Sequence, residues 1–315
     1  METFTGRPGR RAVLALGAGA ALTAAMPAGG AARASGGGPP SGDAAIRRLA
    51  DLERQHDARL GVFAQDTVTG RTVGYRADEL FPICSVHKTL TAAAILRDLD
   101  RDGEFLARRI RYTAKDVTDA GYAPITGRPE HLANGMTVAE LCAAAIAHSD
   151  NAADNLLLRE LGGPSAITRF SRSLGDGVTR LDRWEPELNS AEPGRPTDTT
   201  SPAAIGRSHR ELVLGDALPP QDRRRLTAWL RANTTGAARL RAGLPEGWSL
   251  ADKTGTGGYG ATNDVGVART PDGAHVVLAV LSTKRDAAAP ADEPLVARAA
   301  AVLAAALRSP REAMA

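Results

Sequence analysis

Strand-like segments lie near both ends of this chain, and helix-like sequence fills the middle. Short apolar runs bounded by turn residues occur at 60–64, 72–75, 249–254, 263–269 and 274–282. Helical spacing predominates between about 85 and 231, and a last helix is expected at 293–307. This order predicts an α+β fold with one antiparallel sheet built from both termini, flanked by helices, and an inserted all-α lobe. A cleft between the two parts is the natural place for a site.

The first 41 residues differ from the rest of the chain. Arg10-Arg11 precedes a modest apolar run at 12–25, and small residues surround Arg33. We expect 1–34 to be a twin-arginine-type export signal and 35–41 a flexible linker, so that the protein is secreted. The alternative is a membrane anchor, but the run is short and interrupted by glycine. We expect 42–315 to form one domain, with an α/β lobe at 42–83 and 232–315 and an all-α lobe at 84–231.

The charge of the chain gives no sign of a polyanionic partner. The formal net charge is +3, but outside residues 1–34 the basic and acidic residues are equal in number. We therefore expect no nucleic acid partner and no stable association with a membrane after the signal is removed. We also expect no cofactor and no metal. The two cysteines, Cys84 and Cys142, are too few to argue for a disulfide framework.

Ser85-x-x-Lys88 is the first motif that suggests chemistry. Pro82 prevents a helix from extending backwards, so Ser85 should lie in a first helical turn, where backbone N–H groups are unpaired. Residues at i and i+3 are neighbours on a helix, so the Lys88 amine can help to remove the serine proton during attack on a carbonyl. The motif is short enough to occur by chance, so it needs partners elsewhere.

Three further groups supply these partners. Ser149-Asp150-Asn151 lies at a helix junction, Glu185 lies on a long proline-rich loop at 181–200, and Lys253-Thr254-Gly255 ends a predicted strand, where glycine would let a ligand approach the backbone. Separately, these would be a helix cap, a solvated carboxylate and an edge-strand lysine. Together and in this order they indicate one site. Only four lysines occur in this arginine-rich chain, and two of them lie in the motifs. A buried amine can release a proton near neutral pH, whereas a guanidinium cannot.

These motifs, with Asn189 four residues after Glu185, resemble those of a class A serine β-lactamase of the actinomycete type, from about residue 42 to the end. The resemblance implies hydrolysis of the β-lactam ring, a small-molecule substrate and a monomer. It implies that Ser85 is the acylated nucleophile, that Lys88 and Ser149 relay protons, and that Glu185 with Asn189 activates the deacylating water. The implied substrate contacts are Tyr122, Asn151, Lys253, Thr254, Gly255 and Thr256, with an oxyanion hole at the backbone N–H groups of Ser85 and Thr256.

Several more positions follow from the resemblance. Arg183 and Asp198 match an ion pair that fixes the Glu185 loop. Thr262 replaces an arginine that many class A enzymes use to bind the substrate carboxylate, and Arg239 resembles the arginine that actinomycete-type members use instead. We expect Arg241, its neighbour, to be only a surface charge. The usual disulfide partners of Cys84 and Cys142 are absent, so both thiols are expected to be free.

Two alternatives share part of this pattern. A D,D-peptidase of the penicillin-binding type has the serine, lysine and Lys-Thr-Gly groups but usually lacks a deacylating carboxylate, so Glu185 discriminates against it. A non-hydrolytic sensor of β-lactams or cell-wall peptides would need a membrane helix or signalling domain after the export segment, and the sequence contains neither pattern.

Overall fold

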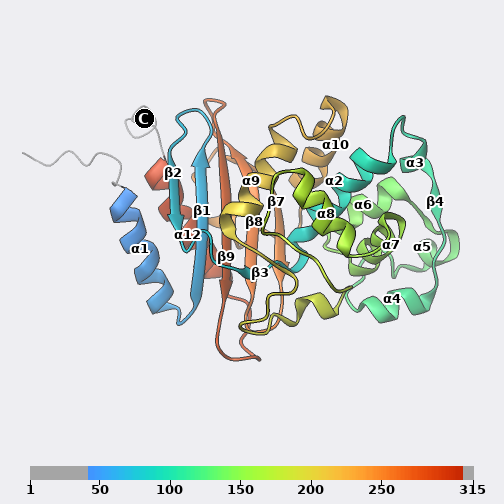
Figure 1. Ribbon diagram of the computed structural model, residues 1–315, viewed down its shortest axis with the longest axis horizontal. Coiled ribbons are helices and arrows are strands. Elements are labelled where there is room, and N and C mark those ends of the chain that lie inside the picture. The colour runs from blue at the N-terminus through green and yellow to red at the C-terminus, as the bar shows by residue number, and fades with distance from the viewer. Residues whose placement is uncertain (1–41, 308–315) are drawn as a thin grey trace, which may run out of the picture. The chain divides into compact units, whose positions relative to one another are not determined.

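The computed structural model describes residues 42–307, and the expected signal and linker lie outside the described residues. A five-stranded sheet has the order β2-β1-β9-β8-β7, with every neighbouring pair antiparallel. Strand β1 from the beginning of the domain pairs with β9 from its end, residue by residue from Arg59↔Thr283 to Asp66↔Val276. The predicted sheet built from both termini is therefore confirmed (Figure 1).

The elements have the following bounds. The strands are β1 (Arg59–Asp66), β2 (Thr72–Tyr75), β3 (Phe81–Pro82), β4 (Arg109–Ile110), β5 (Met136–Thr137), β6 (Thr199–Thr200), β7 (Ser249–Thr256), β8 (Thr262–Arg269) and β9 (His275–Thr283). The helices are α1 (Gly42–Gln55), α2 (Lys88–Ala94), α3 (Glu104–Ala107), α4 (Ala114–Ala120), α5 (Pro129–Asn134), α6 (Val138–Ala147), α7 (Asn151–Leu161), α8 (Ser165–Ser173), α9 (Pro202–Val213), α10 (Pro220–Arg231), α11 (Leu240–Gly243) and α12 (Glu293–Leu307). Two 3-10 turns, η1 (Cys84–His87) and η3 (Glu187–Ser190), and a π-helical turn, η2 (Ile95–Leu99), complete the set.

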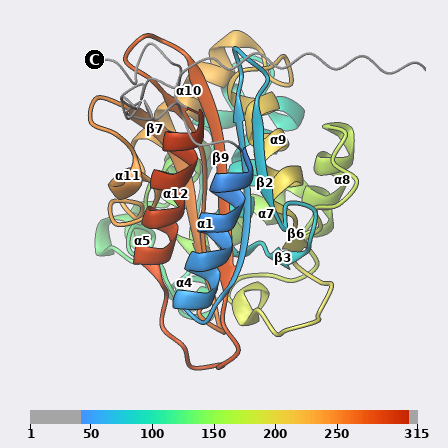
Figure 2. The same ribbon diagram turned by 90° about the vertical axis from the view of Figure 1, so that its left-hand side faces the viewer.

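The sheet has a hydrophobic core on each face. Side chains alternate along a strand, so in β9 Val276, Leu278 and Val280 enter one core while Val277 and Ala279 enter the other. Helices α1 and α12 lie side by side over the first face (Figure 2). The terminal helices thus cover one face of the sheet that the terminal strands build.

The other face of the sheet is covered by helix α9 and continues into the helical part. Although α9 lies within the insertion at 84–231, it packs against β1, β8 and β9. Gly206 allows this approach, because a Cβ there would lie 2.7 Å from the ring of Phe63. The insertion also contains the short strand pair β4–β5, and its β6 pairs with β3.

Three helices begin with local capping signals. Thr137 and Glu140 form a reciprocal capping box on α6, and the side chain of Asp150 accepts a hydrogen bond from Ala153 N at the start of α7. Ser201 caps α9, which has proline at its first position. The Asp150 cap matters most for function, because it fixes the chain at the Ser149-Asp150-Asn151 motif.

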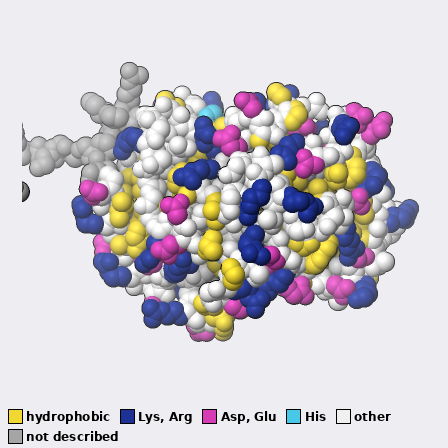
Figure 3. Space-filling model, in the orientation of Figure 1, with side chains coloured by type: hydrophobic (Ala, Val, Ile, Leu, Met, Phe, Trp, Pro, Cys, Tyr) yellow, Lys and Arg dark blue, Asp and Glu magenta, His cyan; other side chains and the backbone are white. Residues whose placement is uncertain are grey.

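The described surface carries both signs of charge. Figure 3 shows basic and acidic side chains scattered over the same face. Between residues 42 and 307, no helix combines the length and the apolar character that crossing a bilayer requires.

Candidate active site

The predicted motifs meet at a cavity of about 330 Å³ beside the end of strand β7. Its lining residues are Ser85, Tyr122, Ser149, Asn151, Asn189, Thr235, Arg239, Thr254, Gly255 and Thr256. All except Thr235 were candidates from the sequence. A larger cavity, of about 710 Å³, lies against residues 191–196 and contains none of the motifs. The smaller cavity is therefore the candidate active site.

Ser85 lies in the 3-10 turn η1, one turn before Lys88 at the start of α2. The serine is 6% exposed and the lysine is fully buried. Lys88 Nζ donates a hydrogen bond to Ser85 Oγ over 3.1 Å. The i,i+3 spacing therefore brings the amine to the hydroxyl, as the sequence predicted.

Lys88 also contacts the two other motifs of the helical part. Its Nζ donates to the Ser149 carbonyl over 2.9 Å and to Asn151 Oδ1 over 2.6 Å. It lies 2.9 Å from Glu185 Oε1, and both side chains are buried. Ser85 Oγ lies 3.5 Å from the same carboxylate oxygen. One buried ammonium thus joins the serine, the carboxylate and the Ser-Asp-Asn motif.

The long loop presents Glu185 to the cavity because several groups fix it. Asn155 on α7 accepts a hydrogen bond from Glu185 N over 3.1 Å and donates one to Glu185 O over 2.9 Å. Asn189 donates to the Glu185 carboxylate. The expected ion pair is confirmed, with Arg183 Nε 2.6 Å from the buried Asp198 carboxylate. The loop is therefore held at the backbone of Glu185, at its carboxylate and by an ion pair between residues on either side of it.

Ser149 lies between the two buried lysines. Lys253 Nζ donates to Ser149 Oγ over 3.1 Å, while Lys88 contacts the Ser149 carbonyl. Burial lowers the pKa of Lys253 to about 7, and the charges of Lys88 and Arg239 add to the effect. Lys253 can therefore exchange a proton with the Ser149 hydroxyl near neutral pH, which is the property that a relay needs.

Two non-glycine residues with positive φ flank the site. Cys84 has φ 46° immediately before Ser85, and Ser149 has φ 57°. Such conformations cost an L-residue on the order of 1 kcal/mol and persist only where surrounding contacts impose them. They aim the Ser85 and Ser149 hydroxyls into the same cavity, and their residue types gave no warning of this in the sequence.

Arg239 reaches the end of β7, as the resemblance implied. It is 5% exposed, and its guanidinium donates to Gly255 O, Asn263 O and Thr256 Oγ1 over 2.8, 2.9 and 2.7 Å. The expectation for Arg241 was wrong. Its guanidinium lies 2.8 Å from the fully buried carboxylate of Asp252, next to Lys253, so it compensates a buried charge.

Packing gives Gly255 a constraint that the sequence did not reveal. A Cβ at this position would lie 3.0 Å from Cys84 Cβ and 3.2 Å from Ile83 O. A side chain at 255 would therefore crowd the turn that carries Ser85, which is a second reason for glycine here; the approach of a ligand to this backbone stays a prediction. It still lines the cavity with its backbone.

Sequence reasoning missed several residues. Asn155, which holds Glu185, lies four residues after Asn151, and this helical spacing could have indicated a shared face. Thr235 has no local signal. His87 and Asp154 form a buried hydrogen-bonded pair beneath the site, and their ligand atoms and those of Glu185 lie within 4.8 Å of one another. We assign no metal there, because Glu185 is engaged by Lys88 and the other two side chains engage each other.

Comparison with known proteins agrees with this geometry. The fold is the β-lactamase fold: the solved structure of a β-lactamase from Streptomyces albus G aligns with a TM-score of 0.82 at 67% identity, covering 82% of this chain and 98% of that one. A β-lactamase from Desulfarculus baarsii aligns with a TM-score of 0.81 at 50% identity, covering 84% of this chain and 97% of that one.

The sequence comparisons lead to the same family. Residues 44–307 match the family described as the β-lactamase enzyme family. A β-lactamase from Streptomyces lavendulae is 62% identical over 98% of this chain and 100% of its own length. The chain belongs to the β-lactamase enzyme family, in class A, and the predicted fold, family and enzyme class are confirmed.

Proposed function

We propose that the protein hydrolyses penicillins and cephalosporins through an acyl-enzyme at Ser85. The observation that supports this best is the position of Ser85 Oγ, 3.1 Å from Lys88 Nζ and 3.5 Å from Glu185 Oε1 in a cavity. In acylation, the oxygen attacks the β-lactam carbonyl carbon and its proton passes to the Lys88–Glu185 pair. The carbonyl oxygen would take hydrogen bonds from the backbone N–H groups of Ser85 and Thr256.

The ring nitrogen must gain a proton when the C–N bond breaks. Ser149 lines the cavity, and its hydroxyl can be supplied with a proton by Lys253, whose Nζ donates to Ser149 Oγ over 3.1 Å. We assign Ser149 as the group that protonates the leaving nitrogen and Lys253 as the amine that restores the Ser149 proton.

Deacylation is assigned to Glu185 and Asn189. Before this step the proton that the Lys88–Glu185 pair took from Ser85 must be released, which makes up for the one that Lys253 gave through Ser149. The carboxylate would then take a proton from a water molecule that attacks the ester carbonyl, and Ser85 would leave with that proton. Asn155 holds the backbone of Glu185, and Asn189 donates to its carboxylate. Substrate binding is assigned to Asn151 for the side-chain amide, Lys253, Thr254, Thr256 and Arg239 for the carboxylate, and Tyr122 for one wall.

Two variants test this assignment. Ser85→Ala should lose covalent labelling by penicillin while its thermal unfolding stays unchanged, because only a hydroxyl is removed. Glu185→Ala should acylate and then accumulate a stable adduct visible by mass spectrometry, because the base for deacylation is gone. Labelled Ser85→Ala protein, or near-normal turnover by Glu185→Ala, contradicts the assignment.

We further propose that 42–315 is a monomeric catalytic domain, secreted through the twin-arginine route. Replacing Arg10-Arg11 by two lysines should retain the enzyme inside the cell, whereas wild-type activity should appear in the medium. Equal secretion of both chains contradicts the proposed route.

A further inference from the structure

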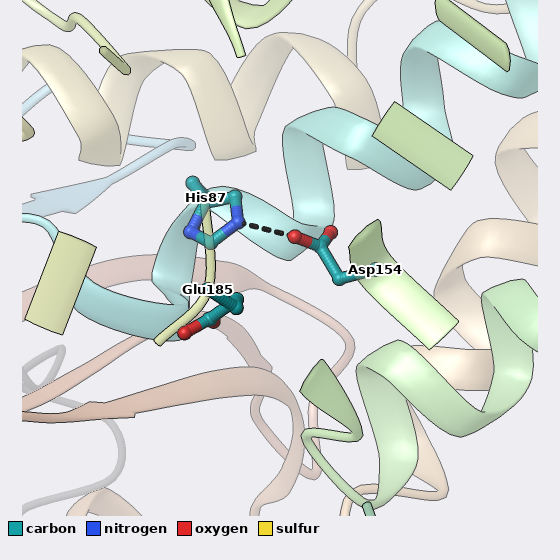
Figure 4. A group of neighbouring side chains, drawn as sticks. All are labelled: His87, Asp154 and Glu185. Carbon is teal, nitrogen blue, oxygen red and sulfur yellow. Dashed lines mark hydrogen bonds and ion pairs between the residues drawn. The ribbon is translucent and has the colours of Figure 1, made fainter. Parts of the chain in front are cut away.

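His87 and Asp154 form a buried pair directly beneath the proposed catalytic groups. His87 belongs to the same 3-10 turn as Ser85, and Asp154 belongs to α7, four residues after Asp150. Both side chains are fully buried, and His87 Nε2 lies 2.8 Å from Asp154 Oδ2. Figure 4 shows this contact, with Glu185 beside His87 on a separate segment.

The other ring nitrogen fixes the protonation state of the pair. His87 Nδ1 lies 2.7 Å from the Cys84 carbonyl, which can only accept, so Nδ1 carries a proton. A second proton must then lie between Nε2 and the Asp154 carboxylate. Whether this proton resides on His87 or on Asp154, the pair has no net charge.

The surroundings favour the ionic form of the pair. Burial alone would lower the pKa of His87, but the charge and hydrogen bond of Asp154 outweigh burial and raise it. Burial would raise the pKa of Asp154, but the charge of His87 outweighs it and the pKa is lowered. Asp154 Oδ1 has no hydrogen-bond partner among residues 42–307, so His87 is its main compensation.

We propose that His87 and Asp154 are a positioning pair for the reaction, which ties the Ser85 turn to α7 and keeps the environment of Glu185 free of an extra negative charge. The link runs from Asp154 through the imidazole to the carbonyl of Cys84, the residue with positive φ just before Ser85. This inference rests on the proposed role of Glu185 as the base.

The charges around the pair show what its loss would do. Lys88 lies 2.9 Å from Glu185, and it and His87 are the cationic groups that lower the pKa of Asp154. The nearby thiols of Cys84 and Cys142 are neutral, because burial raises the pKa of each. If His87 alone is removed, Lys88 is the cation that remains near Asp154. Lys88 is then shared between two carboxylates and stabilises ionised Glu185 less well. The unpaired carboxylate also repels Glu185 directly.

The test compares single and double variants by the pH profile of kcat. His87→Phe leaves Asp154 unpaired, so the acid limb of kcat for a chromogenic cephalosporin should move up by about one pH unit, the usual effect of a like charge at this range. Below this limb, acyl-enzyme should accumulate in mass spectra. Adding Asp154→Ala removes the charge and should return the limb to its wild-type position. Asp154→Asn keeps a neutral hydrogen-bonding partner and should leave the limb unmoved.

A structural control is available in the same molecule. His209 is fully buried, with Nδ1 on the Ile205 carbonyl and Nε2 on the Thr89 hydroxyl, so His209→Phe removes a buried imidazole without leaving a charge. It should not move the acid limb. If pairing were only a matter of packing, the double variant would be no better than His87→Phe, and this result overturns the proposal.

The remaining outcomes are also decisive. An unmoved limb in folded His87→Phe overturns the proposal. If His87→Phe does not fold, the proposal requires that the His87→Phe, Asp154→Ala double variant folds and keeps the wild-type acid limb. A shifted acid limb in Asp154→Asn also overturns the proposal. Glu185→Ala in the wild-type background separates the two hypotheses. If Glu185→Ala accumulates no acyl-enzyme, the assignment of Glu185 as the base is wrong. If it does accumulate acyl-enzyme, but His87→Phe and the double variant have the same acid limb, the proposed role of the His87–Asp154 pair is wrong.

Discussion

Removing the guanidinium of Arg239 gives the sharpest test of how the cavity recognises an anionic substrate. The group lies 2.7 Å from Thr256 Oγ1 at the end of β7, and Lys253 is the other cation close by. A hydrogen bond to a charged group contributes about 1.5–3 kcal/mol. Arg239→Ala should therefore lower kcat/KM for a penicillin by roughly 10- to 150-fold.

The same substitution also affects the folded state. Gly255 O and Asn263 O lose a buried donor, and an unsatisfied acceptor costs about 1–3 kcal/mol. Thermal unfolding must therefore be measured beside the kinetics, at a temperature where the variant is fully folded. Arg48→Ala, at an exposed position on α1, is a suitable control for loss of an arginine. Arg241→Ala is not, because it would strand the buried Asp252 carboxylate.

The decisive comparison uses a penicillin and its methyl ester. The ester lacks the negative charge, so Arg239→Ala should change its kcat/KM far less than that of the acid. Adding Thr262→Arg should restore part of the loss, because Thr262 pairs with Thr256 across β7 and β8. Recovery should be partial, since the Thr262 hydroxyl that accepts from Asp292 N is lost. Equal losses for acid and ester would show that Arg239 acts on the fold and not on the substrate carboxylate.

Two further outcomes follow from buried groups. Two thiols per chain should titrate only after denaturation, because Cys84 and Cys142 are free and fully buried and burial raises the pKa of Cys84 to about 12; fast reaction of the native protein contradicts this. Burial also lowers the pKa of His209 to about 4. Between about pH 6.5 and 4 the unfolded chain then binds a proton that the folded chain does not, so stability should fall as pH falls through this window, by at most about 3 kcal/mol. His209→Phe should flatten that dependence in chemical denaturation, and an unchanged slope contradicts it.

The local features of this fold could be read from the sequence because short-range contacts determine them. The capping box at Thr137, the cap at Asp150 and the proline after Ser201 each act within four residues. The Ser85–Lys88 contact is one helical turn long. Resemblance to a known family then indicated that the distant motifs come together in one site.

Contacts between distant segments could not be read in this way. Nothing near Gly255 in sequence shows that the turn containing Cys84 packs against it, and nothing near Arg241 indicates the buried Asp252 eleven residues later. His87 and Asp154 are 67 residues apart, and either alone would be interpreted as a solvated polar residue. Their meaning depends on the pairing that the fold creates.

The surroundings of the two buried lysines, Lys88 and Lys253, suit an amine better than the guanidinium that this arginine-rich chain uses elsewhere. Lys88 is compensated by Glu185 at 2.9 Å, whereas Lys253 has no carboxylate in direct contact within residues 42–307 and its pKa falls to about 7, chiefly through burial. A guanidinium at position 253 would stay charged at every working pH, and it would do so next to Lys88 and Arg239. An amine can lose its proton to reduce this repulsion and regain it when an anionic substrate arrives. Lys253 thus adds to this small cavity an amine whose charge can change near neutral pH.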